Sequence, residues 1–169
     1  MRAVLSIGSN MNDRYALLSG VVEEFRDEIV SLSSIYATPP WGVEDQDEFL
    51  NAVVVVDVEC TPLELLRRGQ RLEERAERVR VRTWGPRTLD VDIVQIREGD
   101  RELLSEDPEL TLPHPWAWQR AFVLIPWLEA EPGAVLHGSP VRSLVENLDP
   151  TDVEGVTRVG EFSADDADD

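Results

Sequence analysis

Residues 84–96 combine a rigid turn with a strand that is apolar except for two carboxylates: Trp84-Gly85-Pro86-Arg87-Thr88-Leu89-Asp90-Val91-Asp92-Ile93-Val94-Gln95-Ile96. Side chains alternate between the two faces of a strand, so Asp90 and Asp92 share one face and Val91 and Ile93 the other. Two neighbouring like charges repel each other and cost desolvation, and a chain tolerates them where cations lie between them. The alternative is a pair of solvated acids on an exposed face.

The composition is that of one soluble globular domain. A chain of 169 residues with 42% hydrophobic and 30% charged residues can bury its own core. We expect a single domain over residues 1–150 and an acidic extension over residues 151–169 whose end is disordered. No apolar run approaches the roughly 20 residues of a membrane span, and the start lacks the pattern of a signal peptide. We therefore expect a cytoplasmic protein, a monomer, without a membrane partner.

Several common sites are excluded by what the sequence lacks. Cys60 is the only cysteine, which excludes an intrachain disulfide, and His114 and His137 are too far apart for a His-x-x-x-His metal pair. All 16 basic residues are arginine, so the lysine of a phosphate-binding loop and a lysine Schiff base are absent. The Gly-x-Gly-x-x-Gly dinucleotide loop is missing as well.

The charge is strongly negative but unevenly distributed. A net charge of −18 argues against nucleic acid as a partner, because nucleic acid requires a basic surface. Eight of the 16 arginines nevertheless lie within residues 67–87. This distribution predicts a small anionic ligand that is bound locally.

The order of predicted elements indicates the fold. Strands are expected over residues 3–7, 29–36, 49–58 and 89–96, with helices after Asn12 or Asp13 and after Thr61. This order predicts an α+β protein with a ferredoxin-like split βαβ core, a mostly antiparallel sheet and helices packed on it. A polar connection is expected over residues 97–107, with a short hairpin through 103–104 and 110–112. Further helices are expected over 116–129 and 141–148.

The predicted second helix has one apolar stripe and one stripe of arginines, and three more arginines follow it. Thr61, Pro62 and Glu64 form a capping-box start, and the predicted buried stripe is Leu65, Gly69, Leu72 and Ala76. We interpret Arg68, Arg71 and Arg75 as a solvated face with salt bridges, in which Glu64 is placed to pair with Arg68. The helical pattern ends before Arg78, Arg80 and Arg82, which have the placement of phosphate ligands in a loop. Asn51 interrupts an apolar strand, either by reaching solvent or by facing a ligand.

These side chains suit one kind of chemistry. Paired aspartates can hold magnesium through oxygen ligands, and a pair of ions can clamp the attacking and leaving oxygens at a phosphorus centre. Arginine forks bind and neutralise phosphate oxygens. Phosphoryl transfer depends mainly on positioning and charge stabilisation. The residues alone therefore predict metal-dependent phosphoryl or pyrophosphoryl transfer from a nucleotide.

The stretch at 84–93 resembles the signature of the 6-hydroxymethyl-7,8-dihydropterin pyrophosphokinase family. Further similarities follow in family order over residues 3–148, at 7–10, 36–40, 49–52, 78–80, 113–115 and 120–122. The resemblance implies transfer of pyrophosphate from ATP to the pterin hydroxymethyl group in folate biosynthesis, with release of AMP and with two Mg²⁺ ions bound by Asp90 and Asp92.

The resemblance also implies a set of site residues. The expected catalytic residues are Arg78, Arg87, Asp90 and Asp92, with Arg78 on a mobile loop. The ATP side would be formed by Leu66, Gln70, Glu73, Arg78, Arg80, Trp84, Arg87, Ile93, Thr111, His114 and Arg120. The pterin side would be formed by Thr38, Pro39, Trp41, Phe49, Asn51, Asp90 and Phe122. On this reading Asn51 faces the ligand.

The chain departs from the family pattern at three positions. Glu77 stands where many members have glycine, Thr83 where many have a basic residue, and Glu109 where some have an arginine that contacts ATP. Three other functions compete with the kinase. They are a ferredoxin-like regulatory module, a metal-dependent nucleotidyl transferase and an RNA-binding sheet, of which the last conflicts with the acidic charge.

Overall fold

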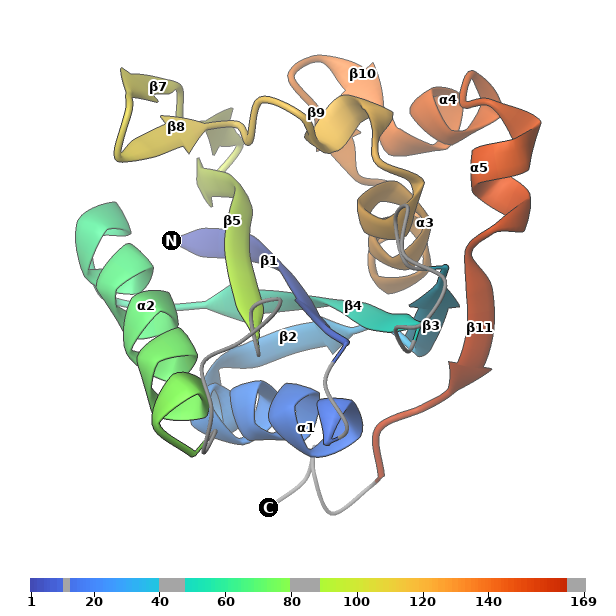
Figure 1. The fold of residues 1–169 in the computed structure, drawn as a ribbon. Helices are drawn as coiled ribbons and strands as arrows, with labels where there is room; N and C mark the ends of the chain where they lie inside the picture. The colour runs from blue at the N-terminus through green and yellow to red at the C-terminus, as the bar shows by residue number, and fades with distance from the viewer. Residues whose placement is uncertain (11–12, 40–47, 80–88, 164–169) are drawn as a thin grey trace.

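The computed structural model describes residues 1–10, 13–39, 48–79 and 89–163 (Figure 1). The strands are β1 (Arg2–Ser9), β2 (Ile29–Leu32), β3 (Ile35–Thr38), β4 (Phe49–Asp57), β5 (Asp90–Glu98), β6 (Arg101–Glu102), β7 (Ser105–Asp107), β8 (Leu110–Leu112), β9 (Val135–Leu136), β10 (Ser139–Pro140) and β11 (Thr157–Gly160). The helices are α1 (Arg14–Glu24), α2 (Pro62–Val79), α3 (Ala121–Ala130), α4 (Val141–Glu146) and α5 (Pro150–Glu154), with short 3-10 turns η1 (Arg26–Glu28) and η2 (Ala117–Gln119).

The main sheet has seven strands and is built around β1. Its order is β11-β3-β4-β1-β5-β6, and β2 pairs with the part of β4 that β3 leaves free. The recorded pairings within the described residues are antiparallel. This arrangement, with one helix after β1 and one after β4, confirms the predicted α+β ferredoxin-like core.

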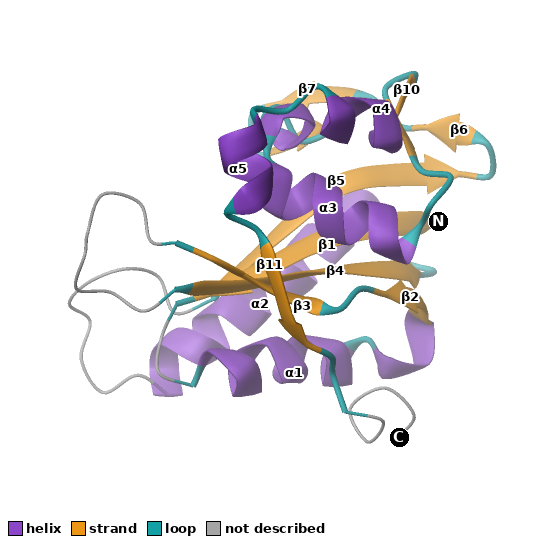
Figure 2. Ribbon diagram, turned by 90° about the vertical axis from the view of Figure 1, so that its right-hand side faces the viewer, coloured by secondary structure: helices purple, strands orange, loops and turns teal. Residues whose placement is uncertain are grey.

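Helices cover both faces of the sheet. Figure 2 shows α1 and α2 on one side and α3 on the other. The core is divided accordingly, because alternate residues of each strand point to opposite faces. Leu5, Val54 and Ile93 pack with α1 and α2, whereas Val4, Val53 and Val94 pack with α3, whose Trp127 is fully buried.

The start of α2 confirms the predicted capping box. The Thr61 hydroxyl accepts a hydrogen bond from the Glu64 backbone N–H at 3.1 Å, and the Glu64 carboxylate accepts one from the Thr61 N–H at 3.0 Å. The predicted stripe is buried, which includes Gly69, where a Cβ would lie 3.2 Å from a methyl group of Val91. A glycine at this position therefore lets α2 approach β5 closely. The helix extends to Val79, so the expectation that it ends before Arg78 is wrong.

Arg68 differs from its predicted role on a solvated face. Its guanidinium binds Glu28 at 2.7 Å and Glu24 at 3.2 Å, and lies 4.3 Å from the centre of the Phe25 ring. The predicted partner, Glu64, instead completes the helix cap. Since the side chain is only 18% exposed, Arg68 joins α2 to the end of α1. Arg71 and Arg75 are exposed, as predicted.

The predicted strand over residues 29–36 is divided into β2 and β3. At the division, the Ser33 hydroxyl accepts a hydrogen bond from the Val53 N–H at 2.9 Å, in a place where a strand carbonyl would normally serve. The Ser33 N–H still donates to the Val53 carbonyl, so the chain stays attached to β4 while its ladder shifts. A serine hydroxyl that competes with backbone groups is a common cause of such breaks.

Two later boundaries also differ from the predictions. The short hairpin forms between β7 and β8, so its first strand is not at the predicted residues 103–104. The Leu103 N–H instead donates to the Ile96 carbonyl, which attaches this residue to the main sheet. The helix predicted over residues 116–129 is instead η2 followed by α3, separated by the extended backbone of Arg120. Pro126 lies inside α3 without ending it.

The last predicted helix, at 141–148, forms as α4 over Val141–Glu146. Beyond it the chain forms α5, which Asp149 caps by accepting a hydrogen bond from Thr151 N–H at 2.8 Å, and then β11. Strand β11 pairs antiparallel with β3 at the edge of the main sheet. The predicted disorder at 164–169 concerns residues outside those described. In the described part of the chain, no helix is long and apolar enough to cross a membrane.

Candidate active site

Asp90 and Asp92 begin β5 on the face of the sheet that α3 covers. Both are half-buried, whereas Val91 and Ile93 are buried on the opposite face, which confirms the predicted alternation. The pairing with β1 places Gly8 opposite Asp90 and Ser6 opposite Asp92. The residues opposite the two carboxylates thus have small side chains.

The α2 side supports this strand from behind. A carboxylate oxygen of Glu73 accepts a hydrogen bond from the Val91 backbone N–H at 2.9 Å, between the two aspartates in sequence. The sequence placed Glu73 on the ATP side, and this contact fixes it against the carboxylate strand. Close packing at Gly69 and the Glu73 hydrogen bond together hold the start of β5 in place.

His114 and Arg120 lie near the carboxylates. The His114 backbone N–H donates to the Val94 carbonyl at 2.9 Å, which attaches this loop to β5. Burial lowers the pKa of His114, and Asp92 opposes this shift while Arg120 adds to it. The lowered pKa keeps the imidazole neutral at pH 7. Its Nδ1 accepts a hydrogen bond from the Trp116 N–H at 3.2 Å, so the ring proton belongs on Nε2.

A polar group on β4 lies on the same face. Asn51 is 5% exposed, and its Nδ2 donates to the Thr38 hydroxyl at 3.0 Å. A Cβ at Gly8 would lie 2.8 Å from the Asn51 Oδ1, so the amide occupies the space above this glycine. The alternative that Asn51 reaches solvent is therefore wrong.

The strand register aligns Asn51 and Asp90 in one row across the sheet. Gly8 is opposite Asn51 on β4 and opposite Asp90 on β5. Adjacent strands lie roughly 4.8 Å apart, so the backbones of Asn51 and Asp90 are separated by about 10 Å with only Gly8 between them. A flat heterocycle and a phosphate chain can occupy the space above such a row.

The aromatic and proline side chains predicted for the pterin side lie on β4, at the end of β3 and near the start of α3. Phe49 is half-buried and opposite Thr38 in the pairing of β3 with β4, and Pro39 is exposed at the end of β3. Phe122 is half-buried near the start of α3, with the Arg120 guanidinium 5.6 Å from its ring centre. These predicted pterin-side residues thus lie on α3 and on neighbouring strands.

Several predicted ATP-side residues have partners elsewhere in the protein. Leu66 packs against the core, and Gln70 accepts a hydrogen bond from Arg67 at 2.7 Å. The Thr111 hydroxyl donates to the Asp107 carbonyl at 3.0 Å. Glu109, which departs from the family pattern, binds the guanidinium of Arg67 with both oxygens at 3.0 Å. This ion pair joins α2 to the β7–β8 hairpin.

The structure leaves part of the predicted site undescribed. Five predicted residues lie outside the described residues: Trp41, Arg80, Arg82, Trp84 and Arg87. Arg78 belongs to the last turn of α2, and its loop position is corrected accordingly.

The sequence did not predict the contact of Gly8 with Asn51 or the hydrogen bond of Glu73 to the Val91 N–H. Gly8 lies in a family-like motif, but the need for a glycine there depends on contact with Asn51 from another strand.

Among the described residues, no group of three or more His, Cys, Asp or Glu side chains is gathered as a metal site. Carboxylate oxygens such as those of Asp90 and Asp92 are ligands that Mg²⁺ uses, commonly together with phosphate oxygens and water. The two carboxylates are half-buried on one face of β5 and supply the hard oxygen donors that such an ion prefers.

The chain is similar to one family of pyrophosphokinases in comparisons with both a family profile and individual proteins. The profile of the family described as 7,8-dihydro-6-hydroxymethylpterin-pyrophosphokinase (HPPK) matches residues 4–132. The chain is 44% identical over 165 residues to the 2-amino-4-hydroxy-6-hydroxymethyldihydropteridine pyrophosphokinase of Mycobacterium tuberculosis, covering 92% of this chain and 88% of that protein. It is 43% identical over 159 residues to the Methylorubrum extorquens protein of the same name, covering 92% and 98%.

Solved structures support the fold. The HPPK-DHPS triple mutant of Plasmodium falciparum with pteroate aligns with a TM-score of 0.65 at 17% identity over 93% of this chain. The wild-type Plasmodium falciparum HPPK-DHPS aligns with a TM-score of 0.61 at 16% identity over 86% of this chain. This chain spans less than half of those structures, 46% and 44% respectively.

Proposed function

This chain belongs to the 7,8-dihydro-6-hydroxymethylpterin-pyrophosphokinase family, and we propose that it transfers the terminal pyrophosphoryl group of ATP to the hydroxymethyl oxygen of 6-hydroxymethyl-7,8-dihydropterin in folate biosynthesis. The pterin oxygen forms a bond to the β-phosphorus, the bond between that phosphorus and the α-phosphate oxygen breaks, and AMP leaves. The observation that carries this proposal is the row of Asn51, Gly8 and Asp90 across three strands.

Asp90 and Asp92 are proposed to hold two Mg²⁺ ions together with the ATP phosphates. Bound there, the ions would neutralise phosphate charge and orient the reacting oxygens. The two carboxylates keep a fixed spacing because β5 is supported by Glu73 and Gly69 of α2. Such preorganisation lowers the cost of assembling the reacting groups.

The ATP side is proposed to lie between the carboxylates and the loop that carries His114. Neutral His114 can donate from Nε2 to an ATP oxygen, because its Nδ1 is already occupied by the Trp116 N–H. Arg120, close enough to His114 to lower its pKa, adds positive charge on this side. Arg78 and Arg87 are proposed to stabilise the group in transfer, in keeping with the family resemblance.

The pterin side is proposed to lie beside the Asn51 amide, which covers Gly8. The Asn51 amide has a donor and an acceptor, which can pair with the amide edge of a pterin ring, and Thr38 orients it. Phe49 and Phe122 supply aromatic surface for a flat heterocycle. The pterin hydroxymethyl group would then point along the row towards Asp90.

Analysis of the phosphorus products tests the proposed reaction. We expect ATP, Mg²⁺ and the pterin alcohol to yield AMP and the pterin diphosphate, detected by ³¹P NMR and chromatography. Omission of either the pterin or Mg²⁺ should abolish AMP formation. Folded protein that forms no AMP with all components present would overturn the proposal.

The same experiment separates the competing functions. A nucleotidyl transferase would release free pyrophosphate and attach AMP to the acceptor. A regulatory module would bind a ligand without consuming ATP. The pair of carboxylates on the same face of the sheet as the Asn51 amide favours the kinase, because a binding module has no need for both.

A further inference from the structure

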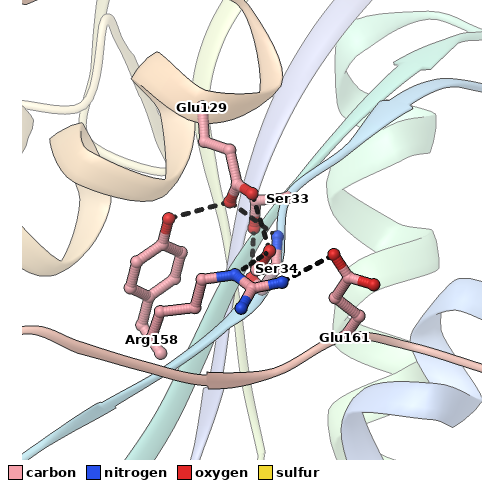
Figure 3. A network of polar contacts seen from close by, with 6 residues as sticks. Ser33, Ser34, Glu129, Arg158 and Glu161 are labelled. Atoms are coloured by element: carbon pink, nitrogen blue, oxygen red, sulfur yellow. Dashed lines mark hydrogen bonds and ion pairs between the residues drawn. The ribbon is translucent and has the colours of Figure 1, made fainter.

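A network of polar contacts joins α3, β3 and β11 (Figure 3). Glu129 of α3 accepts three hydrogen bonds: from the Ser34 N–H at 2.7 Å, the Ser34 hydroxyl at 2.6 Å and the Tyr36 hydroxyl at 2.8 Å. Arg158 of β11 donates from Nε to the Ser34 hydroxyl at 2.9 Å, and its other end binds Glu161 at 2.6 Å. Residues more than 90 positions apart in the chain are thereby held together.

The network lies directly beside the proposed pterin side. Tyr36 is opposite Asn51 in the pairing of β3 with β4, and Thr38, two residues further along β3, accepts the Asn51 hydrogen bond. On α3, Phe122 precedes Glu129 by seven residues, about two turns or roughly 10 Å. The contacts of Glu129 thus connect the helix that carries Phe122 with the strand that orients Asn51.

The C-terminal segment holds the other edge of β3. Thr157 is opposite Ala37 and Arg158 is opposite Tyr36, so β3 is paired with β4 on one side and with β11 on the other. Before β11, Gly155 lies close to Pro39, since a Cβ there would be 3.7 Å from the proline ring. Segment 150–160 therefore contacts the end of β3 at which the proposed pterin residues begin.

The charges of the network persist over the physiological pH range. Burial, together with the Glu129 hydrogen bond and charge, raises the pKa of Tyr36 to about 12, so its hydroxyl remains a donor. Burial alone would raise the pKa of Glu129, but the hydrogen bonds from Ser34 and Tyr36 and the charge of Arg158 outweigh it and lower that pKa. Glu129 accordingly remains a carboxylate and accepts all three bonds.

We propose that segment 150–160 is part of the pterin subsite, and that Glu129 and Arg158 are positioning residues that hold β3 and α3 at the spacing the pterin requires. This inference rests on the proposed function. A four-residue strand such as β3 has few ladder hydrogen bonds of its own, so its alignment depends on these contacts at both edges. Loss of either positioning residue lets Thr38 and Asn51 move relative to Phe122.

The test compares Glu129→Gln and Arg158→Ala with the wild-type chain in steady-state kinetics. Arg142→Ala on α4 is the matched control, since this exposed arginine lies elsewhere in the C-terminal region. We expect the KM for the pterin to rise about fivefold to tenfold in both variants, as for loss of a charge-assisted hydrogen bond. The KM for ATP should remain at the wild-type value, and Arg158→Lys should recover part of the loss.

A structural role alone would give a different pattern. An unchanged pterin KM, or equal changes in both KM values, would overturn the inference even if Tm falls. Should Glu129→Gln fail to fold, Tyr36→Phe removes one hydroxyl from the same network and must show the same selective rise. If the wild-type chain releases no AMP, the proposed function fails, and the inference is then decided by pterin Kd values of the same variants.

Discussion

The two halves of the candidate active site are held together in different ways. The carboxylate half lies on β5 and is supported by α2, which precedes it in the chain, through Glu73 and Gly69. The pterin half is assembled from β3, β4 and α3 and is bounded by β11, and two of its hydrogen bonds join residues 93 and 124 positions apart. The support of the carboxylate strand by α2 thus joins residues that are close in the chain, whereas the pterin half also needs contacts between distant segments.

This difference suggests a division of sensitivity. Changes in the carboxylate half should affect metal binding and chemistry while leaving the fold intact, because Asp90 and Asp92 are half-buried at the start of a strand. Changes in the pterin half should weaken the binding of the pterin, even where the substituted residue does not touch the pterin.

Asp92→Ala should lower turnover by about a thousandfold or more, because it removes one of the two proposed magnesium ligands. Glu98→Ala, an exposed acid at the other end of β5, is the control and should keep normal turnover. Circular dichroism should show the same fold for both variants. Near-normal turnover in Asp92→Ala would exclude this residue as a metal ligand.

Asn51→Ala should raise the KM for the pterin by about 30-fold, since a site built to hydrogen-bond a polar edge loses its partner. Gly8→Ala should act in the same direction, because its Cβ would lie 2.8 Å from the Asn51 Oδ1 and displace the amide. Exposed Asn147→Ala on the C-terminal side provides the comparison. A rise confined to the KM for ATP would contradict the placement of the pterin.

Arg68→Ala should reduce the free energy of unfolding by about 2 kcal/mol, because it removes charge-assisted hydrogen bonds and a ring contact between α1 and α2. The KM for the pterin should remain unchanged, since these helices lie on the face of the sheet away from the pterin side. Arg71→Ala, exposed on the same helix, should change stability little. Urea denaturation measures the difference, and equal stability of the two variants would argue against the bridging role.

Thr61→Ala should cost about 1 kcal/mol through loss of the helix cap, the smallest effect in the series. Thr61→Ser retains the hydroxyl and should recover most of this stability. Thermal unfolding of the two variants gives the comparison. If Thr61→Ser were as destabilised as Thr61→Ala, the hydroxyl would not be the source of the effect.

The parts of the fold that the sequence predicted depend on local patterns. Alternation over residues 89–93 and the capping signals at Thr61 and Glu64 were confirmed because each is decided within a few residues. The pairing of Arg68 was missed because Glu24 and Glu28 lie 40 or more positions away, while a plausible partner, Glu64, lies one turn away.

Strand β11 could not be predicted from the sequence either, because it too depends on residues far away in the chain. Three of the four residues of β11 are exposed, so the strand has no alternating apolar pattern to predict it. It forms because β3 offers a free edge, which only the folded sheet provides. The contacts of Glu129 were likewise invisible from the sequence, since they depend on how α3 lies across β3.

The most direct test of the division is the Mg²⁺ dependence of turnover, measured at saturating ATP and pterin for Asp92→Asn and Asn51→Ala. We expect Asp92→Asn to require at least about tenfold more Mg²⁺ for half-maximal turnover, because it weakens a metal ligand without changing the size of the side chain. Asn51→Ala should require the same Mg²⁺ concentration as the wild-type chain. A similar shift in both variants, or none in Asp92→Asn, would contradict the assignment of the two halves.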